Sequence, residues 1–117
     1  MLYAANEEYE MNLSKETLKT MAAFGGGMAV ESVCGALTGS LAVISIMFTK
    51  ERAHESDRIK NLTKEFFDSF NTSLTTDNCA KLKAKYRNDE IRCQSIVETA
   101  GELLEKIILR EKAKGGL

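Results

Sequence analysis

The fold of this chain depends most on residues 25–39, which read GGGMAVESVCGALTG. Three consecutive glycines favour a left-handed backbone, so we expect the preceding helix to end near Phe24. Ser32 is a suitable N-cap for the next helix, which we expect to run from about residue 33 to residue 50. That segment is apolar on nearly all sides, and this pattern predicts a central helix buried in the protein.

The glycines of this stretch have both a packing and a chemical interpretation. Gly35 and Gly39 stand one turn apart on the predicted helix and leave a groove where another helix can approach closely. Consecutive N–H groups at Gly25, Gly26 and Gly27 could bind an anion ahead of a helix. We favour a tight connection between packed helices, because the chain has neither a P-loop lysine nor a GxGxxG motif after a strand.

Helical periodicity continues on both sides of this stretch, whereas β-type alternation of any length is absent from the sequence. Upstream, residues 2–9 read as a helix already under way, and we expect its natural start to lie before Met1. Ser14 is a good N-cap for the following helix, and Glu16 lies in its first turn. The N-terminal part of the chain is therefore expected to be helical.

Downstream, apolar patterns predict three more helices. The first stripe lies on residues 59–70, and a short helix capped by Thr76 or Asp77 follows it. The last helix opens near Asn88 and carries the longest stripe, formed by Cys93, Ile96, Val97, Ala100, Leu103, Leu104, Ile107 and Ile108. The sequence therefore predicts an all-α fold, a single small bundle of about five helices.

Length and charge narrow the function classes. At 117 residues the chain fits one helical domain over residues 1–117, with a frayed tail at residues 112–117. Its net charge of -1 and the lack of a basic stripe argue against nucleic-acid binding. The longest apolar stretch, residues 41–48, is too short for a membrane span, which needs about 20 residues. Because no signal peptide is recognisable, we expect a cytoplasmic protein.

Three cysteines, Cys34, Cys79 and Cys93, are the strongest candidates for chemistry. Cys34 falls in the first turn of the predicted buried helix, where the helix dipole and free N–H groups favour a thiolate and lower its pKa. Cys79 also lies near a helix start, and Cys93 shares a face with core positions. If Cys79 and Cys93 both face the central helix, the three sulfurs converge. A structural role stays open, since free cysteine often acts as a small buried hydrophobe.

Missing motifs exclude several cysteine-based functions. The sequence contains no CxxC, which argues against a zinc ribbon and a thioredoxin-type site. It contains no CxxCH, so a covalently attached c-type haem is not expected. The single histidine, His54, lies in a charged segment and is expected to be solvated.

The glycine triplet and the cysteine motif together resemble a known family. Residues 25–28, GGGM, followed by residues 34–39, CGALTG, are similar to the signature of the C-GCAxxG-C-C family. Cys79 and Cys93 follow in the order in which that family carries its later cysteines. The resemblance covers nearly the whole chain. Members of this family are small proteins described as redox-active, with four characteristic cysteines.

The resemblance implies a helical domain whose cysteines form a redox or metal site. It carries over to Cys34, Cys79 and Cys93, with support from the motif glycines Gly25, Gly26, Gly27, Gly35 and Gly39. The family's first cysteine has no counterpart here, because it would fall just before Met1. Either the start of the sequence is misassigned or truncated, or this member has lost the residue, and a four-thiolate site is not expected from the residues present.

Three hypotheses follow for the function. The first is thiol–disulfide exchange or electron transfer with an unidentified redox partner, which would make the protein a thiol-dependent oxidoreductase. In it, Cys34 is the attacking thiolate and Cys79 or Cys93 the resolving thiol. The second is a metal ion or iron–sulfur cluster held by the same three thiolates and a fourth ligand. The third is a helical interaction module with structural cysteines, in which the first helix and the glycine groove could form a homodimer.

Overall fold

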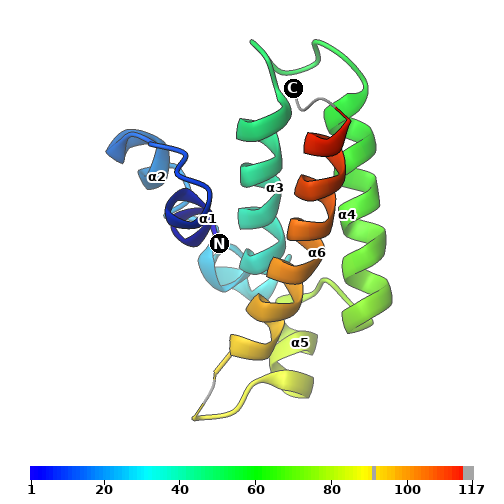
Figure 1. Ribbon diagram of the computed structural model, residues 1–117. Helices are drawn as coiled ribbons and strands as arrows, with labels where there is room; N and C mark the ends of the chain where they lie inside the picture. The colour runs from blue at the N-terminus through cyan, green and yellow to red at the C-terminus, as the bar shows by residue number, and fades with distance from the viewer. Residues whose placement is uncertain (91, 115–117) are drawn as a thin grey trace.

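Helices make up most of the structure, a computed structural model that describes residues 1–90 and 92–114 (Figure 1). Five helices have seven residues or more: α1 (Leu2–Glu8), α3 (Gly35–Phe48), α4 (Arg58–Leu74), α5 (Cys79–Tyr86) and α6 (Gln94–Ala113). Two shorter ones, α2 (Lys15–Lys19) and η1 (Gly27–Glu31), lie between α1 and α3. Within the described residues, β structure is limited to two isolated bridges. The prediction of an all-helical fold is confirmed.

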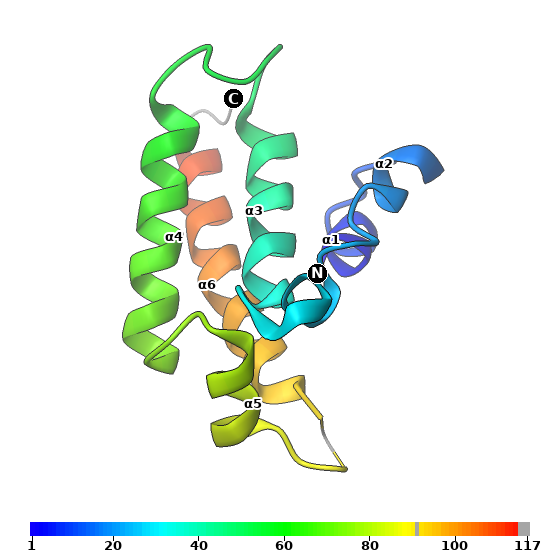
Figure 2. The ribbon, with the colours of Figure 1, turned by 180° about the vertical axis from the view of Figure 1, so that it is seen from behind.

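Helices α3, α4 and α6 pack against one another and form the centre of the molecule (Figures 1 and 2). α3 and α6 run in the same direction and α4 runs in the opposite one, so α3 and α6 begin at the same end. All three helices contribute side chains to the core, and the most deeply buried are Leu37, Val43, Ile44, Phe66, Phe70, Ile96 and Ile108. The expected central position of α3 is confirmed.

The predicted apolar stripes match the buried faces of α4 and α6, with one exception. On α4 the buried positions include Leu62, Phe66 and Phe70, as predicted. On α6 the buried positions are Ile96, Ala100, Leu104, Ile107, Ile108 and Glu111. Val97 was expected in the α6 stripe, but it is 42% exposed.

The central helix is shorter than the predicted range, residues 33–50. α3 begins at Gly35 with Cys34 as its N-cap, so Ser32 does not open it. The reason lies outside the helix: Val33 pairs with Asn78 in an antiparallel bridge, which keeps residues 32–34 out of the helix. At the other end Thr49 is already extended, and a loop follows in place of the last predicted turn.

The charged segment after α3 forms a loop and does not extend the helix. The Glu55 carboxylate accepts hydrogen bonds from the backbone N–H groups of Lys50, Glu51 and Arg52. These bonds hold the pKa of Glu55 below its ordinary value. His54 lies exposed in the same loop, as expected.

The start of the chain confirms its predicted cap and corrects the length of its second helix. Ser14 caps α2 by accepting a hydrogen bond from the N–H of Thr17. α2 ends at Lys19, not near Phe24, and turns cover residues 20–24. The predicted left-handed exit is confirmed at Gly26 and Gly27, whose φ angles are +61° and +62°.

The last helix begins later than predicted. α6 opens at Gln94 with Cys93 as its N-cap, because residues 88 and 92 are joined in the second isolated bridge. The predicted frayed tail, residues 112–117, lies partly outside the described residues. Within them the helix continues through Ala113.

Glycines in α3 let two other parts of the chain approach closely. A Cβ placed on Gly39 would come within 2.8 Å of the Met1 Cβ, so α1 rests directly on this position. A Cβ on Gly35 would lie 3.2 Å from the Phe24 carbonyl oxygen. The predicted close approach is therefore present, and the segments that approach these glycines belong to this chain's own N-terminal part.

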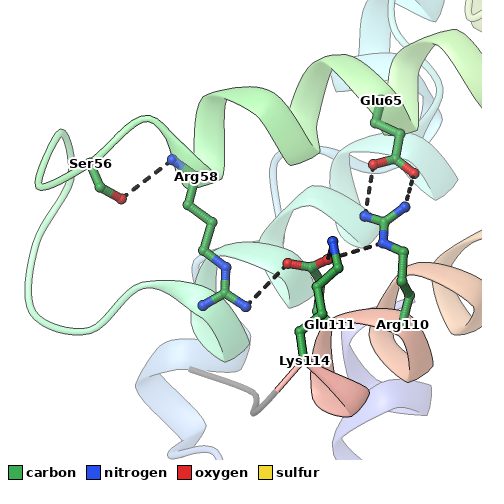
Figure 3. A network of polar contacts seen from close by, with 6 residues as sticks. All are labelled: Ser56, Arg58, Glu65, Arg110, Glu111 and Lys114. Atoms are coloured by element: carbon green, nitrogen blue, oxygen red, sulfur yellow. Dashed lines mark hydrogen bonds and ion pairs between the residues drawn. The ribbon is translucent and has the colours of Figure 1, made fainter.

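A buried carboxylate joins α6 to α4 at the end where the 49–57 loop lies (Figure 3). Glu111 accepts hydrogen bonds from Arg58 at 3.2 Å and Arg110 at 3.0 Å, and Lys114 lies at 3.4 Å. Arg110 also makes two hydrogen bonds to Glu65 on α4. Burial raises the pKa of Glu111, but the bonds from Arg110 and Arg58 outweigh it and hold that pKa below its ordinary value.

In the part of the chain that the structure describes, no helix is both long enough and apolar enough to cross a membrane.

Candidate thiol site

The three cysteines lie at the starts of three helices. Cys34 is the N-cap of α3, Cys79 is the first residue of α5, and Cys93 is the N-cap of α6. These helix starts lie at one end of the molecule, away from the 49–57 loop (Figures 1 and 2). All three cysteines are free thiols.

A short backbone pairing connects Cys34 with Cys79. The N–H of Cys34 donates to the carbonyl of Asp77 at 2.8 Å, and the N–H of Cys79 donates to the carbonyl of Ser32. These two bonds flank the antiparallel bridge between Val33 and Asn78. In the register of this bridge, positions 34 and 79 are diagonal neighbours.

Gly27 lies directly against this pairing. A Cβ on Gly27 would be 2.7 Å from the Cys79 Cβ and 2.5 Å from the Ser32 nitrogen, so no larger residue fits. Its φ of +62° is also a backbone conformation that favours glycine. The left-handed backbone continues through Met28 and Ala29, where a side chain makes it costly. Gly27 therefore forms part of the wall beside Cys79.

Polar side chains within residues 71–78 hold the segment that leads into α5. The sequence analysis did not predict this role for them. Asn78 caps α5 by accepting a hydrogen bond from the N–H of Lys81, so the predicted caps, Thr76 and Asp77, are wrong. Thr76 instead accepts from the N–H of Asn78. The Asp77 carboxylate accepts from the Asn71 amide at 3.0 Å. Asparagine three residues before a helical N–H is a common capping pattern, and this signal could have identified Asn78.

Burial, and not the helix dipole, dominates the chemistry of Cys34. The residue is 8% exposed, and removal from water raises the pKa of its thiol. The side chain makes no capping hydrogen bond. The N–H groups of Ala36 and Leu37 lower the pKa of the thiol, but by less than burial raises it. Negative charge on Cys79 or Cys93 raises the pKa further. The predicted lowering of the Cys34 pKa is therefore wrong.

The three cysteines differ in burial. Cys79 is 6% exposed, whereas Cys93 is only partly buried against the edge of the core. Among the described residues, no group of three or more His, Cys, Asp or Glu side chains has the arrangement of a metal site.

The five glycines of the motif have different structural roles. Gly27 contacts Cys79, and Gly35 follows Cys34 at the start of α3. A Cβ on Gly25 or Gly26 would meet no atom within 4 Å, so these two serve the turn alone. Gly39 lies one turn further along α3, where it accommodates Met1.

Comparison with known proteins gives one match. Neither the curated proteins nor the solved structures contain a protein that matches this chain. One family model matches residues 1–107, and its description reads "Putative redox-active protein (C_GCAxxG_C_C)". This match spans the cysteines, the glycine triplet and the five longer helices up to residue 107 of α6. The chain therefore belongs to the C_GCAxxG_C_C family.

Proposed function

We propose that this protein is a thiol–disulfide redox protein in which Cys34 and Cys79 form a reversible disulfide and Cys93 is the third thiol of the site. The observation that carries the proposal is the backbone pairing of residues 32–34 with residues 77–79. This pairing supports the proposal because it joins the backbones next to two buried cysteines that come from distant parts of the sequence. Membership of a redox-active family supports the same class of function.

The reaction is a two-electron exchange with a partner disulfide. Oxidation forms one S–S bond in this protein and breaks one in the partner, which leaves as two thiols with the two protons. A disulfide needs Cβ atoms about 3.5–4.5 Å apart. Diagonal neighbours in an antiparallel pair lie up to about 7–8 Å apart. Oxidation therefore draws Cys34 and Cys79 closer, with a local shift of the bridge and of the loop at Gly27.

The proposal also includes the domain organisation, the cellular compartment and the redox partner. The chain acts as a single helical domain over residues 1–117, in the cytoplasm, where thiols rest in the reduced form. Its redox partner is a molecule that carries a disulfide, and turnover makes the protein a thiol-dependent oxidoreductase.

Disulfide mapping tests the proposal. Protein purified without oxygen is treated with one equivalent of a disulfide oxidant, alkylated, digested and analysed by mass spectrometry before and after reduction. We expect one linked peptide pair that contains Cys34 and Cys79 and disappears with reductant. Cys34→Ser and Cys79→Ser should each abolish that pair. Three freely alkylated thiols under every oxidant would overturn the proposal.

The same preparation tests the alternative in which these thiols bind a metal ion or an iron–sulfur cluster. That alternative uses Cys34, Cys79 and Cys93 as ligands, with a fourth ligand from elsewhere. Metal analysis should give close to one equivalent of metal or cluster per chain if it is correct. If a triple Cys→Ser variant keeps its fold and its partners, the cysteines are structural and the third hypothesis, an interaction module, is favoured.

A further inference from the structure

A side-chain contact ties the segment between α4 and α5 back to α4 itself (Figure 2). The amide of Asn71, near the end of α4, donates one hydrogen bond to the Asp77 carboxylate at 3.0 Å and another to the Phe67 carbonyl at 3.0 Å. Because both partners accept hydrogen bonds, only the NH2 group of the Asn71 amide can face them. The bond to the carboxylate is charge-assisted, which makes it stronger than a bond between neutral groups.

Asp77 transmits this contact to the cysteine site. Its backbone carbonyl accepts the hydrogen bond from the N–H of Cys34 at 2.8 Å, while its carboxylate is held by Asn71. Two residues further along, the N–H of Cys79 donates to the carbonyl of Ser32. Asp77 therefore joins α4 to the backbone of Cys34, and it lies two residues before the second thiol of the proposed pair.

Residues 75–79 form the side of the bridge that has more freedom to shift on oxidation. On the other side, Cys34 opens α3, a helix of the buried centre, and Val33 packs against the core. Residues 75–78 instead connect two helices, and α5 packs mainly on α6 and η1. A closer approach of the two sulfurs therefore requires a shift of residues 75–79, and the bond between Asn71 and Asp77 resists that shift.

We propose that Asn71 is a positioning residue that sets the redox potential of the Cys34–Cys79 pair. This inference rests on the proposed function. Through Asp77, Asn71 holds the connecting segment in the geometry of the two free thiols, so it stabilises the reduced form more than the oxidised form. Oxidation removes two electrons and two protons from the two thiols, and Asn71 takes part in neither transfer. Loss of the contact should make the potential more negative.

A redox titration of matched variants tests this role. Wild type, Asn71→Ala and Asn61→Ala are equilibrated anaerobically in thiol–disulfide buffers, and the Cys34–Cys79 disulfide is measured by alkylation and mass spectrometry. Asn61 is an exposed residue of the same type near the start of α4, away from the cysteines (Figure 1). Asn71→Ala should favour the disulfide about fivefold, which is about 20 mV towards more negative potential, and Asn61→Ala should match the wild type.

The potential separates a positioning role from a purely structural one. A substitution that destabilises the reduced and oxidised forms equally does not change the equilibrium between them. Asn71→Asp keeps the size of the side chain but places a second carboxylate against that of Asp77, so its shift should exceed that of Asn71→Ala. Asp77→Asn keeps an acceptor for the Asn71 amide without the charge, so it should shift the potential less than Asn71→Ala does.

A double-mutant cycle tests whether Asn71 acts through Asp77. Asp77→Ala removes the carboxylate and keeps the backbone carbonyl that accepts from Cys34. In that background Asn71→Ala should have no further effect on the potential. An Asn71→Ala shift in the equilibrium of less than about twofold, a shift in the opposite direction, or a full shift in the Asp77→Ala background would overturn the inference.

The wild-type titration distinguishes failure of this inference from failure of the proposed function. If the wild type forms no Cys34–Cys79 disulfide in any buffer, the proposed function itself fails, and the role of Asn71 fails with it. A wild-type disulfide whose potential is the same in Asn71→Ala overturns only the role of Asn71.

Discussion

At Cys34 two opposite effects act on one sulfur. The start of α3 offers N–H groups that favour a thiolate, which is the effect that the sequence predicts. The pairing of residues 32–34 with residues 77–79 buries the same side chain, and burial favours the neutral thiol. The second effect is larger, and it depends on a contact between segments more than forty residues apart in the sequence. The position of Cys34 was predictable from its motif, whereas its pKa was not.

The pKa of Cys34 should therefore exceed its ordinary value of 9.0. In a Cys79→Ser/Cys93→Ser variant burial remains, so the rate of alkylation should still rise with a midpoint above that value. The folded state then holds the thiol proton more tightly than the unfolded state. Stability from this group is present below the unfolded pKa and is lost as the pH rises through the folded pKa. The same variant unfolded in urea is the control, and a folded midpoint at or below about 8.5 would contradict the account.

The glycine triplet gives a graded series of substitutions by alanine. Gly25→Ala should change the free energy of unfolding by less than about 0.5 kcal/mol, because nothing lies within 4 Å of its new Cβ. Gly26→Ala has open space but a φ of +61°, so it should cost about 1–2 kcal/mol. Gly27→Ala adds a clash with Ser32 and Cys79, for a total of about 2–5 kcal/mol.

Urea unfolding measures the free energy of unfolding of the three variants. The alkylation rate of Cys79 is a second, independent measurement. Only Gly27→Ala should also increase the alkylation rate of Cys79, because it alone displaces that side chain. Equal costs at the three positions would show that the loop has no defined left-handed conformation.

The sequence predicted the buried faces of the helices well, but it predicted their first and last residues less accurately. Apolar spacing predicted the buried faces of α4 and α6 because a long helix repeats the same pattern over many turns. The ends of α3 and α6 were wrong by two to several residues, because isolated bridges hold residue 33 and residues 88 and 92 outside the helices. Such pairings depend on tertiary contacts that no local pattern contains.

The docking of α1 on α3 should depend on Gly39. Gly39→Ala places a Cβ 2.8 Å from the Met1 Cβ, so α1 must shift. We expect a cost of about 1–3 kcal/mol and faster amide hydrogen exchange in α1. Gly101→Ala on α6 is the matched control. It has nothing within 4 Å and should stabilise the protein by about 0.5–1 kcal/mol. Unchanged exchange in Gly39→Ala would mean that α1 does not rest on this position.

The link between α4 and α6 should depend on the charge of Glu111. Its carboxylate is buried, but Arg58 and Arg110 remain partly exposed, so Glu111→Gln should cost about 1–3 kcal/mol at neutral pH. Because the folded pKa is lowered from 4.5, this stability is present above that value and is lost as the pH falls through the folded pKa.

Urea unfolding of wild type and Glu111→Gln between pH 7 and pH 3 measures this dependence. The difference between the two proteins should shrink below about pH 4.5. A difference that stays constant across this range would show that the charge of Glu111 does not contribute.

For the whole molecule, topology determines the site. α3 and α6 run in parallel, which brings the N-caps Cys34 and Cys93 to one end, and the bridge from residue 33 to residue 78 adds Cys79. The sequence predicted the three cysteines and the glycines that support them. It contained no information on which helix starts lie together, nor on the partial exposure of Cys93, because both arise only from the packing of the helices.

A redox titration tests the central claim, that the thiols form one reversible two-electron site. The protein is equilibrated anaerobically in a series of thiol and disulfide buffers, starting from the reduced form and from the oxidised form. The fraction of Cys34–Cys79 disulfide is then measured by alkylation and mass spectrometry. We predict one transition that is the same in both directions, with a tenfold change in the oxidised-to-reduced ratio per about 30 mV. A curve that differs between the two directions, or oxidised protein without a Cys34–Cys79 link, would contradict the account.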